Sequence, residues 1–114
     1  MEQWEQDLIA AVRELARTKF IDRAPAADLA GTFPAASINE LKALGVSRMS
    51  LPKTLGGLEV SGACQMRVME EIAYGDGSTA VAMNMHIIVA EFLNVLPPFP
   101  RRIAAEFERR FGVR

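Results

Sequence analysis

The chain has 114 residues, of which 50% are hydrophobic and 24% are charged, and its formal net charge is −1. This length suffices for one small domain, and the balanced charge offers no basic field for nucleic acid or an anionic membrane. A single cysteine and a single histidine exclude a disulfide framework and a Cys/His metal site, and they fit a reducing compartment. The acidic start MEQWEQDL is unlike a secretory signal, and polar residues interrupt the longest apolar run. We therefore expect a cytoplasmic protein with no transmembrane span and no metal.

Residues 2–20 are typical of an amphipathic helix. Their apolar side chains recur at spacings of three and four, at Trp4, Leu8, Ile9, Val12, Leu15, Ala16 and Phe20. Acidic residues come early and basic residues late in this segment, as the helix dipole favours. Pro25 should interrupt a straight continuation, with a shorter helical piece running through Asp28. The Gly-Thr-Phe-Pro sequence at 31–34 then predicts a turn.

A capping box, Ser-Ile-Asn-Glu at 37–40, predicts the start of a short helix that Gly45 ends. The loop that follows, SLPKTLGGLEVS at 50–61, contains Pro52 and a glycine pair at 56–57. Proline fixes φ and glycine reaches positive φ, so the loop is predicted to be a rigid connector between helices. A DNA-binding helix-turn-helix is disfavoured here, because Pro52 would lie inside its recognition helix and few cations are nearby.

The second half of the chain predicts three more helices. Ser61 can cap a helix over 62–75, and Ser78 can cap another that runs to about Asn94. Prolines at 97, 98 and 100 should end that helix, before a charged amphipathic helix over 101–111. No long β-alternation occurs, so the sequence predicts an all-α fold of five to six helices.

The segment TAVAMNMHIIVAEFL at 79–93 is apolar on every face except at Asn84, His86 and Glu91. A helix that is hydrophobic all round is normally buried all round. Four or five short helices can scarcely enclose another one completely. We therefore expect further protein, either another domain or another subunit, to cover this helix.

Five short motifs occur in a fixed order along residues 5–95. They are Asp28 with Gly31–Pro34, a capped helix ending in Leu44-Gly45, Leu51-Pro52-Lys53 with Gly56-Gly57, Glu70–Gly75 (EEIAYG), and Ser78 with a helix containing Asn84 and His86. In this order and spacing they resemble the N-terminal helical domain of the acyl-CoA dehydrogenase family. The resemblance implies an orthogonal helical bundle, with 1–114 as a single N-terminal domain of a longer enzyme. The tail, 97–114, departs from the family pattern.

The resemblance also implies an activity that this chain would not perform alone. Such enzymes carry out FAD-dependent α,β-dehydrogenation of acyl-CoA thioesters, and an electron-transfer flavoprotein reoxidises the flavin. FAD lies between a β-domain and a C-terminal helical domain, and a glutamate of the latter removes the α-proton. By this resemblance the chain holds no catalytic residue and forms part of the acyl pocket. Its partners would be acyl-CoA, the missing domains or another subunit, and further copies in a homo-oligomer.

The same resemblance places Ala80, Val81 and Asn84 at the far end of the acyl pocket, although core packing is the alternative role for all three. Asn84 is the best functional candidate, because a buried amide must satisfy its hydrogen bonds. The glycine pair at 56–57 could also approach a ligand with its backbone. His86 is expected to be a satisfied core or interface histidine, and its sole acidic neighbour in sequence, Glu91, is poorly placed on a helix.

Two further expectations concern reactive side chains. Glu70 and Glu71 are adjacent, so on a helix they point about 100° apart and do not share a site. One of them should pair structurally and the other should be solvated. Cys64 has no histidine or lysine nearby in sequence and should be inert.

Two alternatives stay open beside the dehydrogenase reading. One is the N-terminal domain of a related flavin-dependent monooxygenase, because the Leu-Pro-Lys-x-x-Gly-Gly motif of this loop also resembles that branch. The other is a stand-alone helical interaction module without catalysis. A stand-alone module should shield its apolar helix by self-association, whereas an enzyme fragment should tend to aggregate.

Overall fold

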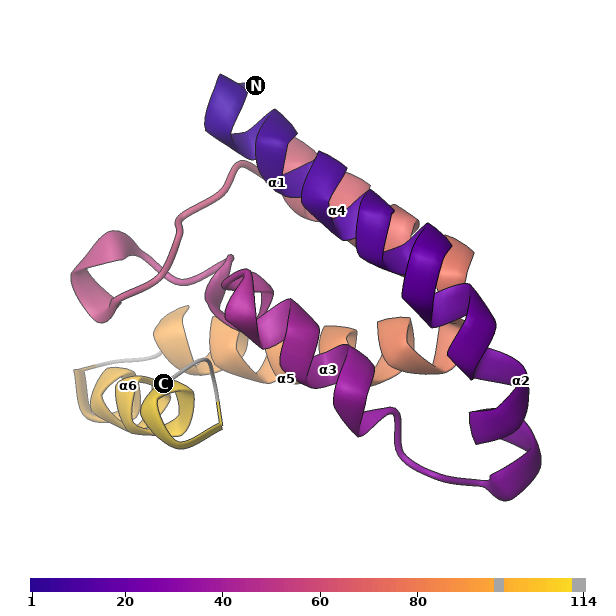
Figure 1. Ribbon diagram of the computed structural model, residues 1–114. Coiled ribbons are helices and arrows are strands. Elements are labelled where there is room, and N and C mark those ends of the chain that lie inside the picture. Colours follow the sequence, from indigo (N-terminus) through magenta and orange to yellow (C-terminus); the bar gives the residue numbers. More distant parts are fainter. Residues whose placement is uncertain (96–97, 112–114) are drawn as a thin grey trace.

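The computed structural model describes residues 1–95 and 98–111, and within them the backbone forms helices and turns but no strand. In chain order the elements are α1 (Gln3–Leu15), a π-helical turn (Ala16–Phe20), α2 (Ile21–Ala30), α3 (Ala35–Ala43), two 3₁₀ turns (Val46–Arg48 and Lys53–Leu55), α4 (Gly62–Gly75), α5 (Gly77–Val95) and α6 (Pro98–Phe111). The all-α prediction is confirmed. In Figure 1, α1 and α4 lie side by side, α3 and α5 cross below them, and α6 folds back against α5.

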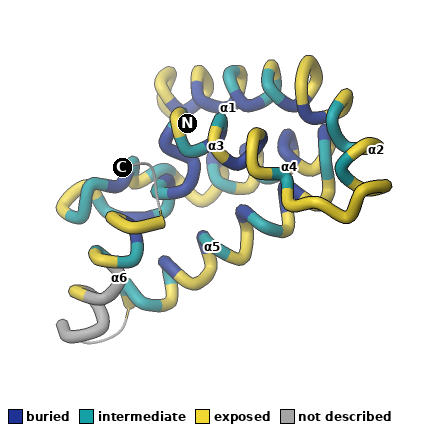
Figure 2. The backbone as a smooth tube through the Cα atoms, turned by 60° about the horizontal axis from the view of Figure 1, so that its bottom comes forward, coloured by how far each residue is buried: buried dark blue, intermediate teal, exposed yellow. Residues whose placement is uncertain are grey.

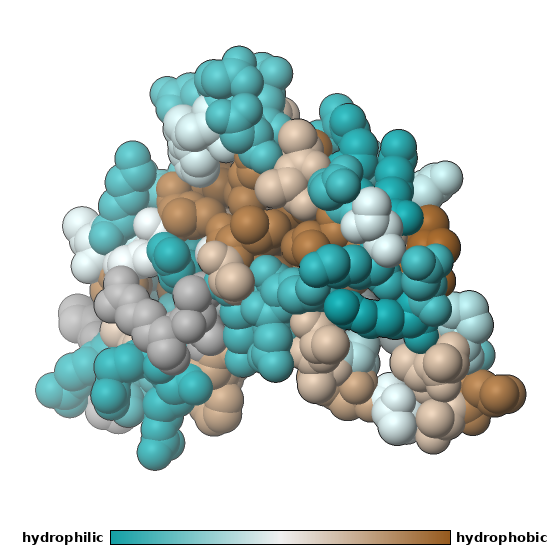
Figure 3. Space-filling view, viewed as in Figure 1, coloured by the Kyte–Doolittle hydropathy of each residue, from teal (hydrophilic) through white to brown (hydrophobic). Residues whose placement is uncertain are grey.

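The core lies where α1, α3, α4 and α5 meet. Its buried apolar side chains include Leu8, Ile9, Val12, Phe20, Ile38, Leu41, Val68, Ile72, Met83 and Ile87. Hydrophobic atoms fill the space between the α1 and α3 ribbons (Figure 3). The predicted apolar stripe of the first helix is confirmed except at Trp4, which is exposed. This burial is the main force that holds the helices together.

The helix does not break at Pro25, so that expectation was wrong. The chain stays helical through the π-helical turn, where the Ile21 amide donates to the Ala16 carbonyl, and α2 includes the proline. Proline removes one helical hydrogen bond and crowds the preceding turn. α2 tolerates it because none of its residues is buried, so a weakened turn there disturbs no core packing. The helix ends at Gly31, whose φ is +66°.

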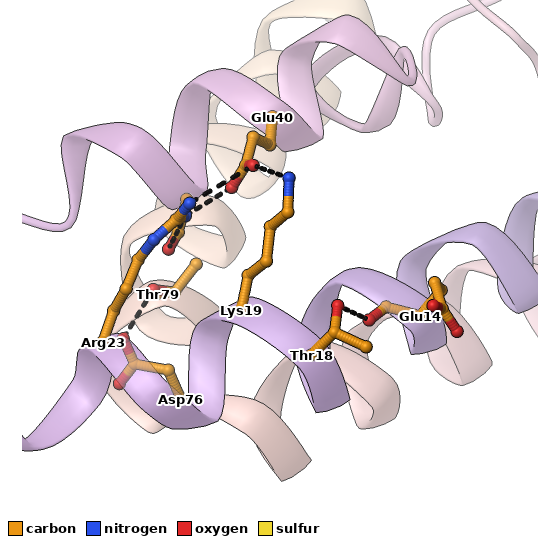
Figure 4. Close-up of polar contacts among 8 residues, drawn as sticks. Glu14, Thr18, Lys19, Arg23, Glu40, Asp76 and Thr79 are labelled. Carbon is orange, nitrogen blue, oxygen red and sulfur yellow. Dashed lines mark hydrogen bonds and ion pairs between the residues drawn. The ribbon is translucent and has the colours of Figure 1, made fainter.

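The predicted capping box at 37–40 is also wrong. α3 begins at Ala35, and Ser37 is buried inside the helix rather than at its start. The Glu40 carboxylate, which would complete the box, pairs instead with the Arg23 guanidinium and with Lys19 at 3.0 Å (Figure 4). These two cations come from the turn and helix beside α3, so a tertiary ion pair replaces the local cap.

The loop at 50–61 is a hydrogen-bonded connector, as predicted. The amides of Leu58, Glu59 and Val60 donate to the carbonyls of Arg48, Leu51 and Met49 at 3.1, 3.0 and 2.9 Å. Gly56 has a φ of +82°, which glycine adopts without strain. Gly57 serves a different purpose: a Cβ there would lie 2.0 Å from the Leu51 carbonyl oxygen. The glycine pair therefore allows one turn and one close backbone approach.

The N-cap residue predicted from the sequence is correct for α4 and wrong for α5. Ser61 caps α4, since its hydroxyl accepts the Cys64 amide at 3.2 Å. α5 is capped by Asp76 rather than by Ser78. One Asp76 carboxylate oxygen accepts the Ser78 amide at 3.1 Å. The other accepts the Thr79 hydroxyl at 2.7 Å, the contact drawn in Figure 4. Aspartate is among the strongest N-caps, so the helix begins at Gly77.

The final helix begins earlier than the sequence predicts. Pro97 lies outside the described residues, but Pro98 and Pro100 fall in the first turn of α6. Amides in a first turn have no helical partner, so proline costs little there. Pro98 and Pro100 therefore lie at the start of α6.

Candidate functional site

α5 has one packed face and one open face. Its packed face consists of Thr79, Ala80, Met83, Ile87 and Ala90. On the open face lies a row of apolar side chains that are 53% to 75% exposed: Val81, Met85, Ile88, Phe92 and Val95, here called the exposed α5 stripe. Figure 2 shows exposed positions recurring along this helix. The helices of the described residues thus leave one side of α5 open, as expected, and its cover by further protein stays a prediction.

The three predicted substrate-binding residues divide between these faces. Ala80 is buried, whereas Val81 and Asn84 are exposed. Val81 and Asn84 are three residues apart, so they are neighbours on the helix surface. The structure therefore brings two of the three together. The premise that Asn84 is a buried amide is wrong here, since α5 turns it outward.

By length and composition alone α5 could cross a membrane. The core helix of a soluble protein can meet the same two criteria. Its inner face packs against α3 and α4, and α6 lies against another side. Asn84, His86 and Glu91 interrupt its apolar sequence. Packing of this kind accounts for its hydrophobic inner face without a membrane.

His86 has partners that sequence reasoning missed. Its Nε2 lies 2.7 Å from the Ser47 carbonyl oxygen and 3.4 Å from a Glu108 carboxylate oxygen. Its ring stacks on Phe107 with centroids 5.2 Å apart. Glu108 is itself buried. Sequence reasoning considered only Glu91, because a partner brought in by the folding-back of α6 leaves no local signal.

Two cavities flank this histidine and its partners. One of about 220 Å³ is lined by α3, α5 and α6 residues that include Lys42, Met83, His86 and Phe111. Another of about 340 Å³ lies between the connector loop and α6, with Arg48, Gly56, Glu108 and Arg109 in its lining. Within the described ranges no three His, Cys, Asp or Glu side chains are placed to hold a metal ion.

The adjacent glutamates behave as predicted. Glu71 is buried and accepts a hydrogen bond from Arg13 Nε at 3.0 Å, with Arg17 at 3.6 Å and Arg67 at 3.8 Å. Glu70 is solvated, with 66% of its side chain exposed. Glu71 therefore ties α1 to α4, and it is not half of a catalytic carboxylate pair.

Cys64 is buried in the core, where its thiol lies 3.9 Å from the Glu5 carbonyl oxygen. Burial raises the pKa of this thiol, and the nearby Glu5 carboxylate adds to the shift. A raised pKa disfavours the nucleophilic thiolate. The surroundings of Cys64 thus agree with the prediction that it is inert.

Residues 2–96 match the sequence model of the family described as acyl-CoA dehydrogenase, N-terminal domain. The human mitochondrial short-chain specific acyl-CoA dehydrogenase is 32% identical over 81 residues, which is 71% of this chain and 20% of that protein. The 3-sulfinopropanoyl-CoA desulfinase of Variovorax paradoxus is 39% identical over 67 residues, 59% of this chain and 17% of that protein. The chain thus spans about a fifth of the length of these curated relatives. No solved structure matches.

Proposed function

This chain belongs to the acyl-CoA dehydrogenase family through its N-terminal helical domain, and we propose that it forms one wall of the acyl pocket of an FAD-dependent acyl-CoA dehydrogenase. The observation that carries the proposal is the family match over residues 2–96, which includes all of α1 to α5. In such an enzyme the chain would bind and orient the acyl group. The proton abstraction and the flavin chemistry would belong to the rest of the enzyme.

The first turns of α5 support this role. Val81 and Asn84 are exposed beside Met85, so together they present an apolar wall with one amide. Acyl pockets need apolar contact along the chain and few polar groups. Ala80 packs inward and would fix the position of this turn. We accordingly assign Val81 and Asn84 to contact with the acyl group, and Ala80 to support behind them.

The face of α5 that would form this wall does not by itself fit a whole FAD. The exposed α5 stripe contains no cation that could bind a pyrophosphate, and Arg13 and Arg17 are committed to Glu71. We therefore place the flavin on parts of the enzyme outside this chain. Its function when bound would be to accept the substrate hydride. We also propose a cytoplasmic homo-oligomer that passes its electrons to an electron-transfer flavoprotein.

A second candidate is another reaction on a CoA thioester. The desulfinase relative supports it, because its name gives a CoA-bound substrate but a different chemistry. A flavin-dependent monooxygenase also remains an alternative, by the resemblance of the connector loop. The reaction on a CoA thioester would retain the wall formed by α5, since the bound group rather than the reaction determines that surface.

The test is to isolate the natural protein with an antibody against this chain, and to record its mass and flavin absorption. The proposal expects a polypeptide several times this length, with a flavin spectrum that saturated acyl-CoA bleaches anaerobically. Flavin that acyl-CoA does not bleach would favour the second candidate, which product analysis then identifies. A flavin-free protein of this chain's own length would overturn the enzyme role and leave a helical interaction module.

In the full enzyme, Val81→Phe should reduce kcat/KM for the longest accepted acyl-CoA at least about tenfold, because added bulk shortens the pocket. Short acyl-CoAs should be affected much less. Met66→Phe is the matched control, because Met66 is exposed on α4 and does not belong to the proposed wall. Equal losses for short and long substrates would contradict the assignment of Val81.

A further inference from the structure

Buried polar atoms without a hydrogen-bond partner gather in two segments of the described part of the chain. They are the hydroxyls of Ser47 and Ser50, the Nε of Arg48 and both carboxylate oxygens of Glu108. The first three residues follow α3 closely in the chain, and Glu108 lies on α6. Buried polar groups almost always have partners, so several unpartnered atoms near one another need a physical explanation.

The Glu108 carboxylate lacks a donor because its histidine neighbour already donates elsewhere. A carbonyl oxygen only accepts, so the hydrogen on His86 Nε2 points to the Ser47 carbonyl oxygen at 2.7 Å. The Glu108 oxygen lies 3.4 Å from the same nitrogen, beyond the usual range for such a bond. Glu108 is only 6% exposed, so bulk water solvates it poorly. A donor on a bound molecule would supply what this carboxylate lacks.

Arg48 lines the same cavity as Glu108 and has the opposite charge. This cavity of about 340 Å³ lies between the connector loop and α6. One terminal nitrogen of Arg48 donates to the Gly56 carbonyl at 2.8 Å, whereas its Nε is buried without an acceptor. The two unpartnered groups thus line one cavity without a hydrogen bond between them. A molecule that joins them must donate to the carboxylate and accept from the guanidinium group.

From this arrangement we propose that the cavity binds a small α-amino acid as its zwitterion. The ammonium group would donate to the Glu108 carboxylate. The carboxylate group would accept from Arg48 Nε, with the guanidinium group of Arg109 also in the lining. A simple cation would meet two guanidinium groups, and a simple anion would meet a buried carboxylate. A zwitterion avoids both repulsions and gives each unpartnered group a charged partner of opposite sign.

The rest of the lining limits the side chain of the amino acid. Leu55 and Ala105 provide apolar contacts, and Thr54 adds one hydroxyl. A volume of about 340 Å³ is near the lower limit for ligand pockets, so the ligand must be small. A short aliphatic side chain fits this lining, whereas a long or charged one does not. L-Valine is therefore a suitable probe.

This site goes beyond the proposed function and does not rest on it. The acyl wall lies on the open face of α5 at Val81 and Asn84, and neither residue lines the cavity between the connector loop and α6. Val81→Phe should therefore leave valine binding unchanged while it alters the use of long acyl-CoAs. Valine binding is also measured without turnover, so failure of one proposal is distinguishable from failure of the other.

Equilibrium dialysis of the natural protein with radiolabelled L-valine tests the proposal. The expected dissociation constant is roughly 10 µM to 1 mM, as for a small ligand with a few charged contacts. Competition by analogues measures the need for each charge at the site that holds the labelled valine. Valinamide lacks the carboxylate, 3-methylbutanoate lacks the ammonium group, and 3-methylbutanamide is neutral. Each should compete at least about tenfold more weakly than unlabelled valine, because it loses one or both charged hydrogen bonds.

Glu108→Gln should weaken valine binding at least about tenfold and should strengthen binding of 3-methylbutanoate, because the buried negative charge is gone. Ala105→Leu is a second variant, which fills the cavity without removing a charge and should block both ligands. Glu14→Gln is the matched control, since Glu14 is exposed on α1 and loses the same charge. Circular dichroism should show that all three keep the wild-type helix content.

Four results would overturn the proposal. The first is no binding of valine up to about 10 mM, which would leave the cavity to water. The second is valine binding that neither Glu108→Gln nor Ala105→Leu weakens. The third is loss of valine binding in Val81→Phe, which would place the ligand in the acyl pocket. The fourth is equal competition by 3-methylbutanamide, which would show that the site selects a neutral amide edge rather than a zwitterion.

Discussion

Glu5 and Ser61, 56 residues apart in the chain, are joined by a hydrogen bond in which the Ser61 amide donates to a Glu5 carboxylate oxygen at 2.7 Å. The other Glu5 oxygen accepts the Glu2 amide at 3.1 Å. Glu5 is buried, so one side chain fixes both the start of α1 and the residue that caps α4. Nothing in the local sequence distinguishes Glu5 from the other acidic residues of the first helix.

We predict that Glu5 makes the fold acid-sensitive. The backbone amides of Ser61 and Glu2 hold the pKa of Glu5 below its usual range. A carboxyl group with a lowered folded-state pKa contributes stability above its unfolded pKa of about 4.3 and loses it as pH falls through the folded value. Chemical denaturation at pH 7 and at about pH 3 should show a smaller fall in stability for Glu5→Gln than for wild type. Equal falls would contradict the role of Glu5.

Gly57 should be intolerant of any side chain. In Gly57→Ala, the new Cβ would meet the Leu51 carbonyl at 2.0 Å, and backbone cannot move aside as a flexible side chain can. We expect a loss of about 1–3 kcal/mol in the free energy of unfolding, as for other overpacked sites. Gly62→Ala is the matched control, because a Cβ there meets nothing within 4 Å and its position is helical. That change should be neutral or stabilising by up to about 1 kcal/mol.

The cap of α5 can be identified by a second matched pair. Asp76→Ala removes the acceptor of two hydrogen bonds and should lower the unfolding free energy by about 1–2 kcal/mol. Ser78→Ala should change it by less than about 0.5 kcal/mol, because the exposed Ser78 side chain does not cap the helix. Thermal denaturation of both variants measures the difference. A larger loss for Ser78→Ala would restore the cap that the sequence predicts.

The predictions from the sequence that proved wrong share one physical cause. Periodicity located every helix, because burial of an apolar face depends on spacing along the chain. Caps and polar partners were less predictable, because several residues compete locally and tertiary contacts decide among them. Ser37 lost its partner Glu40 to Arg23, and His86 gained Ser47 and Glu108 from distant segments. In the candidate site, Val81 and Asn84 form one surface, but their exposure could not be read from an evenly apolar sequence.

Glu71 provides the last prediction, because it is the buried acceptor shared by Arg13, Arg17 and Arg67. Removing a buried charge usually costs several kcal/mol when it strands a buried partner. Here the side chains of the three arginines are 41% to 50% exposed, so water can solvate them once the carboxylate is gone. Glu71→Ala should therefore cost about 1–2 kcal/mol, mostly from lost charged hydrogen bonds between α1 and α4.

Glu70→Ala is the control for Glu71, because its ion pair with Arg67 spans 3.7 Å on an exposed helix surface. Exposed pairs of this kind contribute between about 0 and 1 kcal/mol. Urea denaturation at low and at high salt should separate the two sites. If Glu70→Ala proved as costly as Glu71→Ala, the shared acceptor would not be the contact that joins α1 to α4.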